Sequence, residues 1–431
     1  MPTEVVCGFR YMHMPCAKNI YKGRNIVKYI VILGDGMADY PVDELGGKTP
    51  LETANKPNID YMCAHGTVGL VSNVPENLAP GSDVANLSAM GYDPQKFYSG
   101  RSPLEAVSIG VDMKDTDVVF RCNLVTVTED EQNYDDKIIT DHSSDEITTD
   151  EAKVLIQAIE ENFGNDMFKF YPGVSYRHAL VWDKGPMSFT LTPPHDILEK
   201  RIGDYMPKGE GAQYLYDMMK RSYDILNNHP INLDRAKRGL NKANSIWIWG
   251  EGRKPQLESF EKKFGIKGSV ISAVDLIKGI AICAGMDSID VEGATGNVHT
   301  NFDGKARAAV KALTDGSDYV YVHMEAPDEC GHRHEIENKV KSIELIDEKV
   351  VGYIREELKN RGIDYKMLIM PDHPTPLKLR THTRDSVPFV IYDSSAERNS
   401  GIDSYTEVNA AKGGINIKDG YTLINMLIDR K

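Results

Sequence analysis

The sequence lacks the features that mark secreted, membrane-spanning or disulfide-stabilised proteins. Its six cysteines include no Cys-x-x-Cys pair, so we expect reduced thiols in a cytoplasmic protein and no disulfide framework. No apolar run reaches the roughly 18–20 residues that a membrane-spanning helix needs, so we expect no membrane association. Residues 1–26 contain no apolar core of a secretory signal, and we expect them to be an N-terminal extension ahead of the folded part.

Positive charge is also scarce. The chain has 50 Lys and Arg residues against 64 Asp and Glu residues, which gives a net charge of −14. Nucleic-acid binding depends on basic patches that neutralise phosphates, so we expect no nucleic-acid partner. A small anionic substrate is compatible with this charge, because a few local Arg and Lys side chains suffice to bind it.

The chain of 431 residues exceeds the size at which one hydrophobic core stops growing, which predicts two domains. Apolar runs of strand length alternate with helical patterns, which predicts an α/β core whose mainly parallel sheet is flanked by helices. The expected strands are 29–33, 68–72, 245–249, 268–272, 318–324, 366–370 and 386–392. The expected helices are 55–65, 83–90, 274–284, 304–314, 335–359 and 420–429.

The middle of the chain has a different pattern. It contains short strand-like pieces at 117–127, 178–182 and 188–192, an acidic stretch at 129–146 and one clear helix at 151–162. This mixture is typical of an α+β unit. We therefore expect an inserted cap domain at 113–240, within a core domain formed by 27–112 and 241–431.

Carboxylates and imidazoles follow three of the expected strands. Asp35 follows 29–33, Asp328 and His332 follow 318–324, and Asp372 with His373 follows 366–370. In open α/β sheets, ligands bind beyond the carboxyl ends of the strands. Each group alone also fits a surface turn or a helix cap, but three such groups together favour a metal site.

His382 lies nine residues after His373, beyond a loop stiffened by three prolines. The chain thus offers more ligands than one ion needs. A mixed set of carboxylates and imidazoles suits Mn²⁺, Mg²⁺ or Zn²⁺. Two ions a few ångströms apart can stabilise both oxygens in a phosphoryl displacement.

Ser82 is the candidate nucleophile for such a displacement. Pro80 and Gly81 form a turn, and Ser82 then begins an expected helix. The free backbone N–H groups and the dipole at a helix start favour an anion. The alternative interpretation is that Ser82 only caps the helix, which is the common role of serine there.

Several longer motifs resemble one family. They are Gly-Asp-Gly-Met-Ala-Asp at 34–39, Gly-Ser-Asp-Val-Ala-Asn at 81–86, Gly-Tyr-Asp-Pro at 91–94, Gly-Arg-Ser-Pro-Leu-Glu-Ala at 100–106, Phe-Arg-Cys-Asn at 120–123, Gly-Ala-Thr-Gly at 293–296, Glu-Ala-Pro-Asp-Glu-Cys-Gly-His at 325–332 and Pro-Asp-His at 371–373. In this order the motifs resemble the archaeal type of cofactor-independent phosphoglycerate mutase, within the alkaline phosphatase superfamily. The resemblance extends from residue 28 to nearly the C-terminus.

The resemblance implies an alkaline-phosphatase-like core and a reaction that interconverts 3-phosphoglycerate and 2-phosphoglycerate without bisphosphoglycerate. It implies that Ser82 becomes phosphorylated. It also implies two divalent ions, of which Mn²⁺ is the expected species. By position, one ion would be held by Asp35, Ser82, Asp372 and His373, and the other by Asp328, His332 and His382.

The cap would close over the site and exclude water, which would otherwise hydrolyse a phosphoserine. Anionic substrate groups call for guanidinium and ammonium side chains. Our candidates are Arg121, Arg177 with His178, and Lys278; each is also compatible with an ordinary surface or strand position. Three other histidines near the clusters are left out, because His323 fits a strand interior and His299 and His334 fit exposed positions.

The cap departs from the family pattern at one place. The chain has Asp-His-Ser-Ser-Asp-Glu-Ile at 141–147, where the archaeal enzymes typically show an arginine-rich stretch. Homoserine kinase activity with the same serine and metal centre is therefore an alternative, and a metal-dependent phosphatase or phosphodiesterase is another. A metal-binding scaffold without catalysis is disfavoured, because neither the serine nor any ligand position is missing. The sequence specifies neither the native metal nor the oligomeric state.

Overall fold

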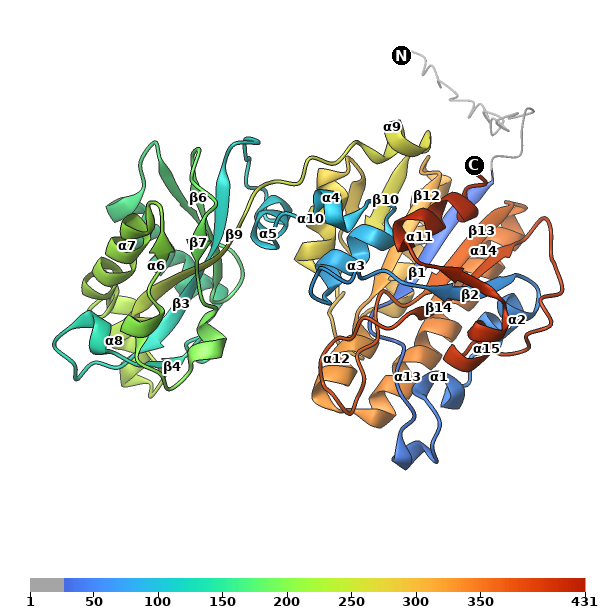
Figure 1. Cartoon of the computed structure of the whole chain (residues 1–431), viewed down its shortest axis with the longest axis horizontal. Coiled ribbons are helices and arrows are strands. Elements are labelled where there is room, and N and C mark those ends of the chain that lie inside the picture. Colours follow the sequence, from blue (N-terminus) through green and yellow to red (C-terminus); the bar gives the residue numbers. More distant parts are fainter. Residues whose placement is uncertain (1–26, 431) are drawn as a thin grey trace, which may run out of the picture.

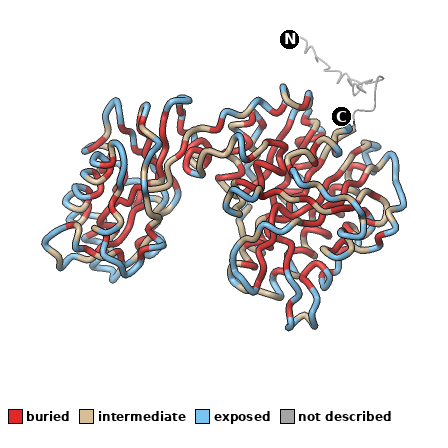
Figure 2. Tube along the Cα trace, in the orientation of Figure 1, coloured by how far each residue is buried: buried red, intermediate tan, exposed pale blue. Residues whose placement is uncertain are grey.

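The structure, a computed structural model, describes residues 27–430. The expected N-terminal extension, residues 1–26, lies outside the described residues. The chain forms two lobes, a larger one around an eight-stranded sheet and a smaller one around a five-stranded sheet (Figure 1). Buried residues concentrate along the strands of both lobes (Figure 2).

The large sheet has the strand order β11-β10-β12-β1-β13-β14-β2-β15. Its strands are β1 (Lys28–Gly34), β2 (Thr67–Val71), β10 (Gly268–Ile271), β11 (Asp287–Ile289), β12 (Tyr319–Met324), β13 (Tyr365–Met370), β14 (Val387–Asp393) and β15 (Ile415–Ile417). Only β14 runs antiparallel to its neighbours, β13 and β2. The predicted α/β core with a mainly parallel sheet flanked by helices is confirmed.

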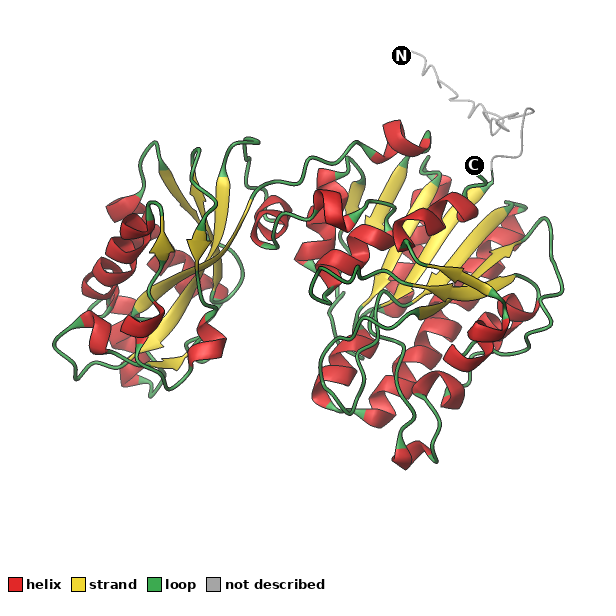
Figure 3. Ribbon diagram, viewed as in Figure 1, coloured by secondary structure: helices red, strands yellow, loops and turns green. Residues whose placement is uncertain are grey.

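Helices cover both faces of this sheet (Figure 3). They are α1 (Pro50–Thr53), α2 (Pro57–Ala64), α3 (Ser82–Ala89), α4 (Pro94–Phe97), α5 (Ser102–Ser108), α9 (Phe260–Phe264), α10 (Asp275–Cys283), α11 (Phe302–Thr314), α12 (Ala326–Arg333), α13 (Ile336–Leu345), α14 (Tyr353–Arg361), α15 (Glu407–Lys412) and α16 (Leu423–Leu427). Each expected core helix coincides with one or more of these elements.

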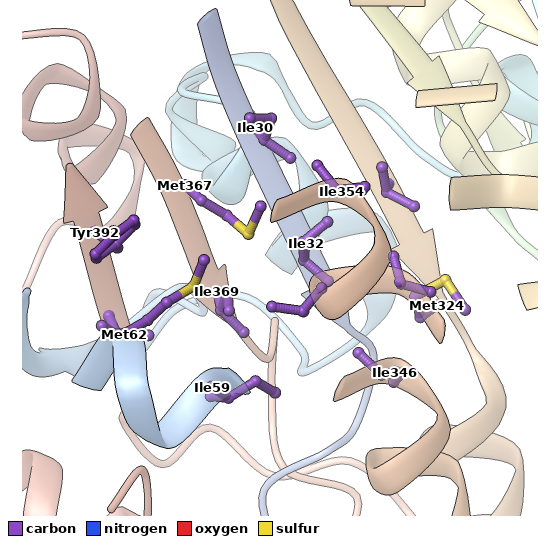
Figure 4. Packing of buried hydrophobic residues seen from close by; sticks show 14 of the residues in the cluster. Ile30, Ile32, Ile59, Met62, Met324, Ile346, Ile354, Met367, Ile369 and Tyr392 are labelled. Carbon is purple, nitrogen blue, oxygen red and sulfur yellow. The ribbon is translucent and has the colours of Figure 1, made fainter. Parts of the chain in front are cut away.

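Strand β1 shows how the two faces are built. Ile30 and Ile32 belong to a hydrophobic cluster with residues of α2, α11 and α13–α14, which Figure 4 shows in part. The alternate residues, Val31 and Leu33, belong to a second cluster with residues of α3, α10 and α16. Because successive strand residues point to opposite faces, a strand covered on both sides is apolar throughout.

The predicted helix at 335–359 is one continuous helix, but it combines α-helical and π-helical segments. A π-helical segment, Ile346–Gly352, joins α13 to α14. Within it, Asp347 is buried and accepts hydrogen bonds from the backbone N–H groups of Asn58 (3.3 Å) and Ile59 (2.7 Å). The wider helical turn thus places a carboxylate at the first turn of α2, whose N–H groups lack partners within the helix.

The smaller lobe is built around β3 (Val118–Val127). The other strands of its antiparallel sheet are β4 (Ile139–Asp141), β5 (Phe168–Tyr171), β6 (Arg177–Trp182) and β9 (Ser245–Gly252), and β7 (Phe189–Thr190) pairs separately with β8 (Lys208–Gly209). The helices are α6 (Thr149–Phe163), α7 (Ala212–Leu226) and α8 (Pro230–Lys237). The sequence predicted α6 but missed α7 and α8.

The predicted place of strand 245–249 was wrong. The boundary at 240 assigned it to the core, but in the structure it is part of β9, which pairs antiparallel with β3. The chain therefore returns to the large lobe after Gly252. At this return, the backbone N–H of Arg253 donates to the carbonyl of Ser99 (3.2 Å), and the Ser99 hydroxyl donates to the carbonyl of Arg253 (2.5 Å). The division into a core and a cap domain stays a prediction.

Two further findings concern the helices and the cysteines. Among the described residues, no helix is long and apolar enough to cross a membrane. Cys63, Cys122, Cys283 and Cys330 are free thiols.

Helix α5 packs closely on α10 at Gly279. A methyl group added at Gly279 would lie 2.0 Å from the backbone oxygen of Leu104 on α5. We expect Gly279→Ala to lower the free energy of unfolding by about 1–3 kcal/mol through overpacking, measured by urea unfolding. Ile282→Ala changes a partly exposed residue of the same helix and should stay within about 0.5 kcal/mol of wild type. Equal stability of the two variants would contradict the close packing.

Candidate active site

The site begins where three adjacent strands end. Strand β1 lies between β12 and β13 and runs parallel to both, with Gly34 paired to Met324 and Leu33 paired to Met370. The carboxyl ends of the three strands therefore meet at one edge of the sheet. The residues that follow them carry the predicted ligands Asp35, Asp328 with His332, and Asp372 with His373.

Asp35, Asp372 and His373 form one group that could hold a metal ion, and all three are buried. The Nε2 atom of His373 lies 3.7 Å from Asp35 Oδ1 and 3.4 Å from Asp372 Oδ2. The Ser82 hydroxyl lies 3.2 Å from the same Nε2 atom. The structure thus brings together all four residues predicted for the first ion.

Ser82 does not cap its helix. The N-cap of α3 is Gly81, and no side chain makes a capping hydrogen bond there. Ser82 is the first helical residue, half-buried, and its hydroxyl contacts the His373 ring. The capping interpretation was therefore wrong, and the hydroxyl is directed to the ligand cluster at the positive end of a helix.

Asp328, His332 and His382 lie together beside the first group. His332 Nε2 is 3.3 Å from Asp328 Oδ2, and His382 Nε2 is 3.4 Å from Asp328 Oδ1. The Nε2 atoms of the two histidines are 2.9 Å apart. Asp328 and His382 also form a candidate metal-binding group with His373, which lies between the two predicted sets.

Burial and mutual repulsion set the electrostatics of the site. Burial, together with the charges of Asp372, Asp328 and Glu325, raises the pKa of Asp35 well above its usual value. Burial alone would raise the pKa of Asp328, but hydrogen bonds from His332 and His382 hold it well below the usual range. The bond to Asp328 raises the pKa of His332 to about 9.

The donor set fits divalent cations. Asp35 Oδ1 is buried and has no hydrogen-bond partner among the described residues, which is costly for a buried polar atom. Several carboxylates lie within the repulsive range of one another, and a cation between them would remove that repulsion. Oxygen and imidazole ligands together suit Mn²⁺, Mg²⁺ or Zn²⁺.

A buried ion pair fixes the proline-rich loop that carries His373. Lys339 and Asp39 are both fully buried, with Nζ 2.7 Å from Oδ2. Lys339 also donates to the carbonyl of Thr375 (2.8 Å), while Asp39 accepts from the backbone N–H of Leu377 (3.1 Å). The Thr375 hydroxyl in turn donates to Asp328 Oδ1. The loop is therefore anchored in the segment between His373 and His382.

The sequence interpretation missed a role of His323. It predicted a strand interior, and the residue is indeed fully buried on β12. However, its Nε2 atom lies 3.0 Å from Asp35 Oδ2, and its Nδ1 atom lies 3.3 Å from the Ser272 hydroxyl. Burial lowers the pKa of His323 to about 3, so the neutral ring orients Asp35. In the structure, Leu33 of β1 pairs with His323 of β12. Sequence periodicity does not show which strands pair, so it could not place His323 next to Asp35.

The other two omitted histidines differ in exposure. His299 is exposed, as predicted. His334 is only half-buried, and its ring contacts the carbonyl of Leu377 through Nδ1 at 2.7 Å.

A cavity of about 300 Å³ lies between the lobes. Arg121, Arg177 and His178 of the smaller lobe line it, together with Glu325 at the N-cap of α12 and Glu329 within that helix. Three of the four predicted substrate-binding residues therefore face one space. A larger cavity of about 930 Å³, lined by residues of α14, β13 and β14, includes none of the predicted site residues.

These side chains differ in how they are held. Both oxygens of Glu105 accept hydrogen bonds from Arg121, which also lies 4.8 Å from the Trp249 ring. Arg177 is exposed. His178 Nδ1 accepts from the backbone N–H of Gly173 (3.0 Å), its Nε2 has no partner within residues 27–430, and burial lowers the pKa of the ring to about 3. A neutral His178 therefore offers an N–H from its unpartnered nitrogen.

Lys278 stands apart from this group. It is not among the residues that line the cavity, and its ammonium lies 2.7 Å from Asp290 Oδ1.

Comparison with known proteins gives consistent results. The model of the 2,3-bisphosphoglycerate-independent phosphoglycerate mutase family matches residues 63–232. A probable 2,3-bisphosphoglycerate-independent phosphoglycerate mutase of Geobacter sulfurreducens is 50% identical over 404 residues, covering 94% of this chain and 100% of the relative. The corresponding enzyme of Methanosarcina barkeri is 45% identical over 406 residues, with 94% and 100% covered.

Two solved structures have a fold similar to that of this chain. A Pyrococcus horikoshii protein has a TM-score of 0.78 at 29% identity, and the match covers 94% of this chain and 97% of the other. The cofactor-independent phosphoglycerate mutase of Thermoplasma acidophilum has a TM-score of 0.65 at 26% identity, covering 94% and 99%.

Metal binding should depend on pH through His332. Its pKa of about 9 in the metal-free protein means that a divalent ion must displace a proton below that pH. We expect the apparent Kd for Mn²⁺, measured by calorimetry, to fall about tenfold per pH unit from pH 7 to about 9, since one proton is released. His299→Gln, which changes an exposed histidine, should keep this slope. Binding that is independent of pH over this range would contradict the assignment of His332 as a ligand.

Proposed function

Because the chain belongs to the archaeal type of 2,3-bisphosphoglycerate-independent phosphoglycerate mutases, we propose that it interconverts 3-phosphoglycerate and 2-phosphoglycerate through a phosphoserine at Ser82. The relatives favour this isomerase activity over the kinase and phosphatase alternatives. No bisphosphoglycerate takes part in the proposed reaction. We also propose a cytoplasmic location, as expected for an enzyme of glycolysis and gluconeogenesis.

One observation carries the proposal: the Ser82 hydroxyl lies 3.2 Å from His373 Nε2, inside the cluster of acidic and imidazole ligands. A serine whose hydroxyl served only to cap α3 would point back to the helix backbone. Its position at the start of α3 also places backbone N–H groups that have no partner within the helix next to the oxygen that would carry the phosphoryl group.

The proposed reaction has two displacements at phosphorus. In the first, Ser82 Oγ bonds to phosphorus while the bond between phosphorus and the substrate oxygen breaks. The products of this step are a phosphoserine and a glycerate that stays in the site. In the second, the other hydroxyl of the retained glycerate bonds to phosphorus and Ser82 is released. Two divalent ions, Mn²⁺ in our proposal, would lower the pKa of the attacking hydroxyl and offset the charge of the phosphoryl oxygens.

The ligand sets of the two ions are also proposals. Asp35, Ser82, Asp372 and His373 would hold one ion. Asp328, His332 and His382 would hold the other.

The cap would retain the glycerate between the two displacements. Arg121, Arg177 and His178 line the cavity between the lobes and supply charged and neutral donors for a carboxylate. Excluding water from this space protects the phosphoserine from hydrolysis. Lys278 is the weakest of the proposed substrate residues, because it does not line this cavity and Asp290 binds its ammonium group.

Replacing the nucleophile tests the proposal directly. With Mn²⁺ and 3-phosphoglycerate, and product formation coupled to enolase, we expect wild-type activity and a loss of at least about 10³-fold in Ser82→Ala, since covalent catalysis is removed. Mass spectrometry of the substrate-treated wild type should show about +80 Da, one phosphoryl group, on the peptide that contains Ser82.

Two outcomes would contradict the proposal. Activity that survives in Ser82→Ala would exclude the serine mechanism. An inactive wild type that phosphorylates homoserine with ATP would transfer the assignment to the kinase alternative.

Substitutions of Arg177 and Lys278 give a matched pair of variants that tests substrate binding. We expect Arg177→Met to raise the KM for 3-phosphoglycerate about tenfold, because an exposed guanidinium that lines the cavity is removed. Lys278→Met should change KM less than twofold, since its ammonium group is bound to Asp290. Steady-state kinetics measures both. A larger effect at Lys278 would show that the cavity is not the substrate site.

A further inference from the structure

Asn86, on α3, connects the proposed nucleophile to one of the proposed metal ligands. The residue is fully buried. Its Nδ2 atom donates to the carbonyl of Ser82 (2.8 Å), one turn earlier, and to Asp372 Oδ2 (2.8 Å). Both amide hydrogens are therefore used within the site.

Tyr321, in the middle of β12, completes these contacts. Its hydroxyl donates to Asn86 Oδ1 at 2.6 Å, and the side chain is fully buried. The chemistry of the partners fixes the orientation of the amide. The Ser82 carbonyl and the Asp372 carboxylate only accept, so the NH₂ group must face them and Oδ1 must face the tyrosine hydroxyl.

Asp372 is consequently held from three sides. Its Oδ1 accepts from the backbone N–H groups of Gly36 (3.2 Å) and His373 (2.8 Å). Its Oδ2 accepts from Asn86 and lies 3.4 Å from His373 Nε2. Removing the Asn86 bond would leave Oδ2 without its only amide donor, and the carboxylate could rotate about its last side-chain bond.

We propose that Tyr321 and Asn86 are positioning residues: the tyrosine hydroxyl orients the amide, and the amide holds the Asp372 carboxylate and the first turn of the Ser82 helix in register. The pair joins three elements of the site, namely β12, α3 and the loop after β13. Mutating a residue that hydrogen-bonds to a metal ligand commonly lowers metal affinity or activity about 10–100-fold. The inference rests on the proposed function in taking Ser82 and Asp372 as site residues.

The neighbouring Tyr319 provides a matched control. It lies two residues earlier on the same strand, is also fully buried, and belongs to the same hydrophobic cluster as Tyr321. Its hydroxyl, however, has no hydrogen-bond partner among the described residues. Replacing either tyrosine by phenylalanine removes one buried hydroxyl and keeps the ring, so only the bond to Asn86 distinguishes the two variants.

The test uses the full chain and Mn²⁺ alone as the probe. By calorimetry we expect Tyr321→Phe to weaken Mn²⁺ binding about tenfold and Tyr319→Phe to leave it within twofold of wild type. In the mutase assay, Tyr321→Phe should lower kcat and leave the KM for 3-phosphoglycerate unchanged, because the cap residues are intact. Circular dichroism and thermal unfolding in EDTA compare the folding of the two variants.

Asn86→Ala gives a second route if Tyr321→Phe folds poorly, since alanine suits a helix interior. We expect the same tenfold loss of Mn²⁺ affinity. In the Asn86→Ala background, Tyr321→Phe should cause no further loss, because the hydroxyl acts through the amide.

Three results would overturn the inference. They are wild-type Mn²⁺ affinity in Tyr321→Phe, equal losses in the Tyr319 and Tyr321 variants, and additive losses in the double variant. An inactive wild type that still binds Mn²⁺ in this pattern would overturn the proposed mutase function and leave the positioning inference standing.

Discussion

The parallel pairing of β1 with β12 on one side and β13 on the other is the constraint on which the site depends. Parallel strands in register end at the same edge, so three separate parts of the chain deliver their polar residues to one place. The strands are apolar on both faces and covered by helices, which keeps this edge fixed. Asp35, Asp328 and Asp372 are then forced into a proximity that costs free energy unless a cation balances their charge.

The rigidity of the cluster comes from bonds behind the ligands. His323 orients Asp35, Asn86 orients Asp372, and the Thr375 hydroxyl bonds to Asp328. The buried pair of Lys339 and Asp39 fixes the loop between β13 and His382. Each carboxylate at the site therefore has a partner from a different element, and this arrangement is what allows several like charges to occupy a buried volume.

The sequence predicted most strands of the large sheet and the polar residues that follow three of them, because apolar runs and the residues after them are local patterns. It could not predict pairing partners. A largely buried apolar strand such as 245–249 is compatible with either sheet, and only the pairing with β3 places it. For the same reason His323 was recognised as buried but not as a neighbour of Asp35. Helix α7 was missed although its buried residues Leu215, Met219 and Leu226 recur at helical spacing.

The contacts between Ser99 and Arg253 hold the two connections of the smaller lobe side by side. A body attached at two adjacent points can turn about the line through them, but it cannot slide or twist freely. In the proposed reaction, this attachment would restrict the approach of Arg177 to an arc about the two connections. The retained glycerate, rather than the lobe, would then be the part that reorients between the two displacements.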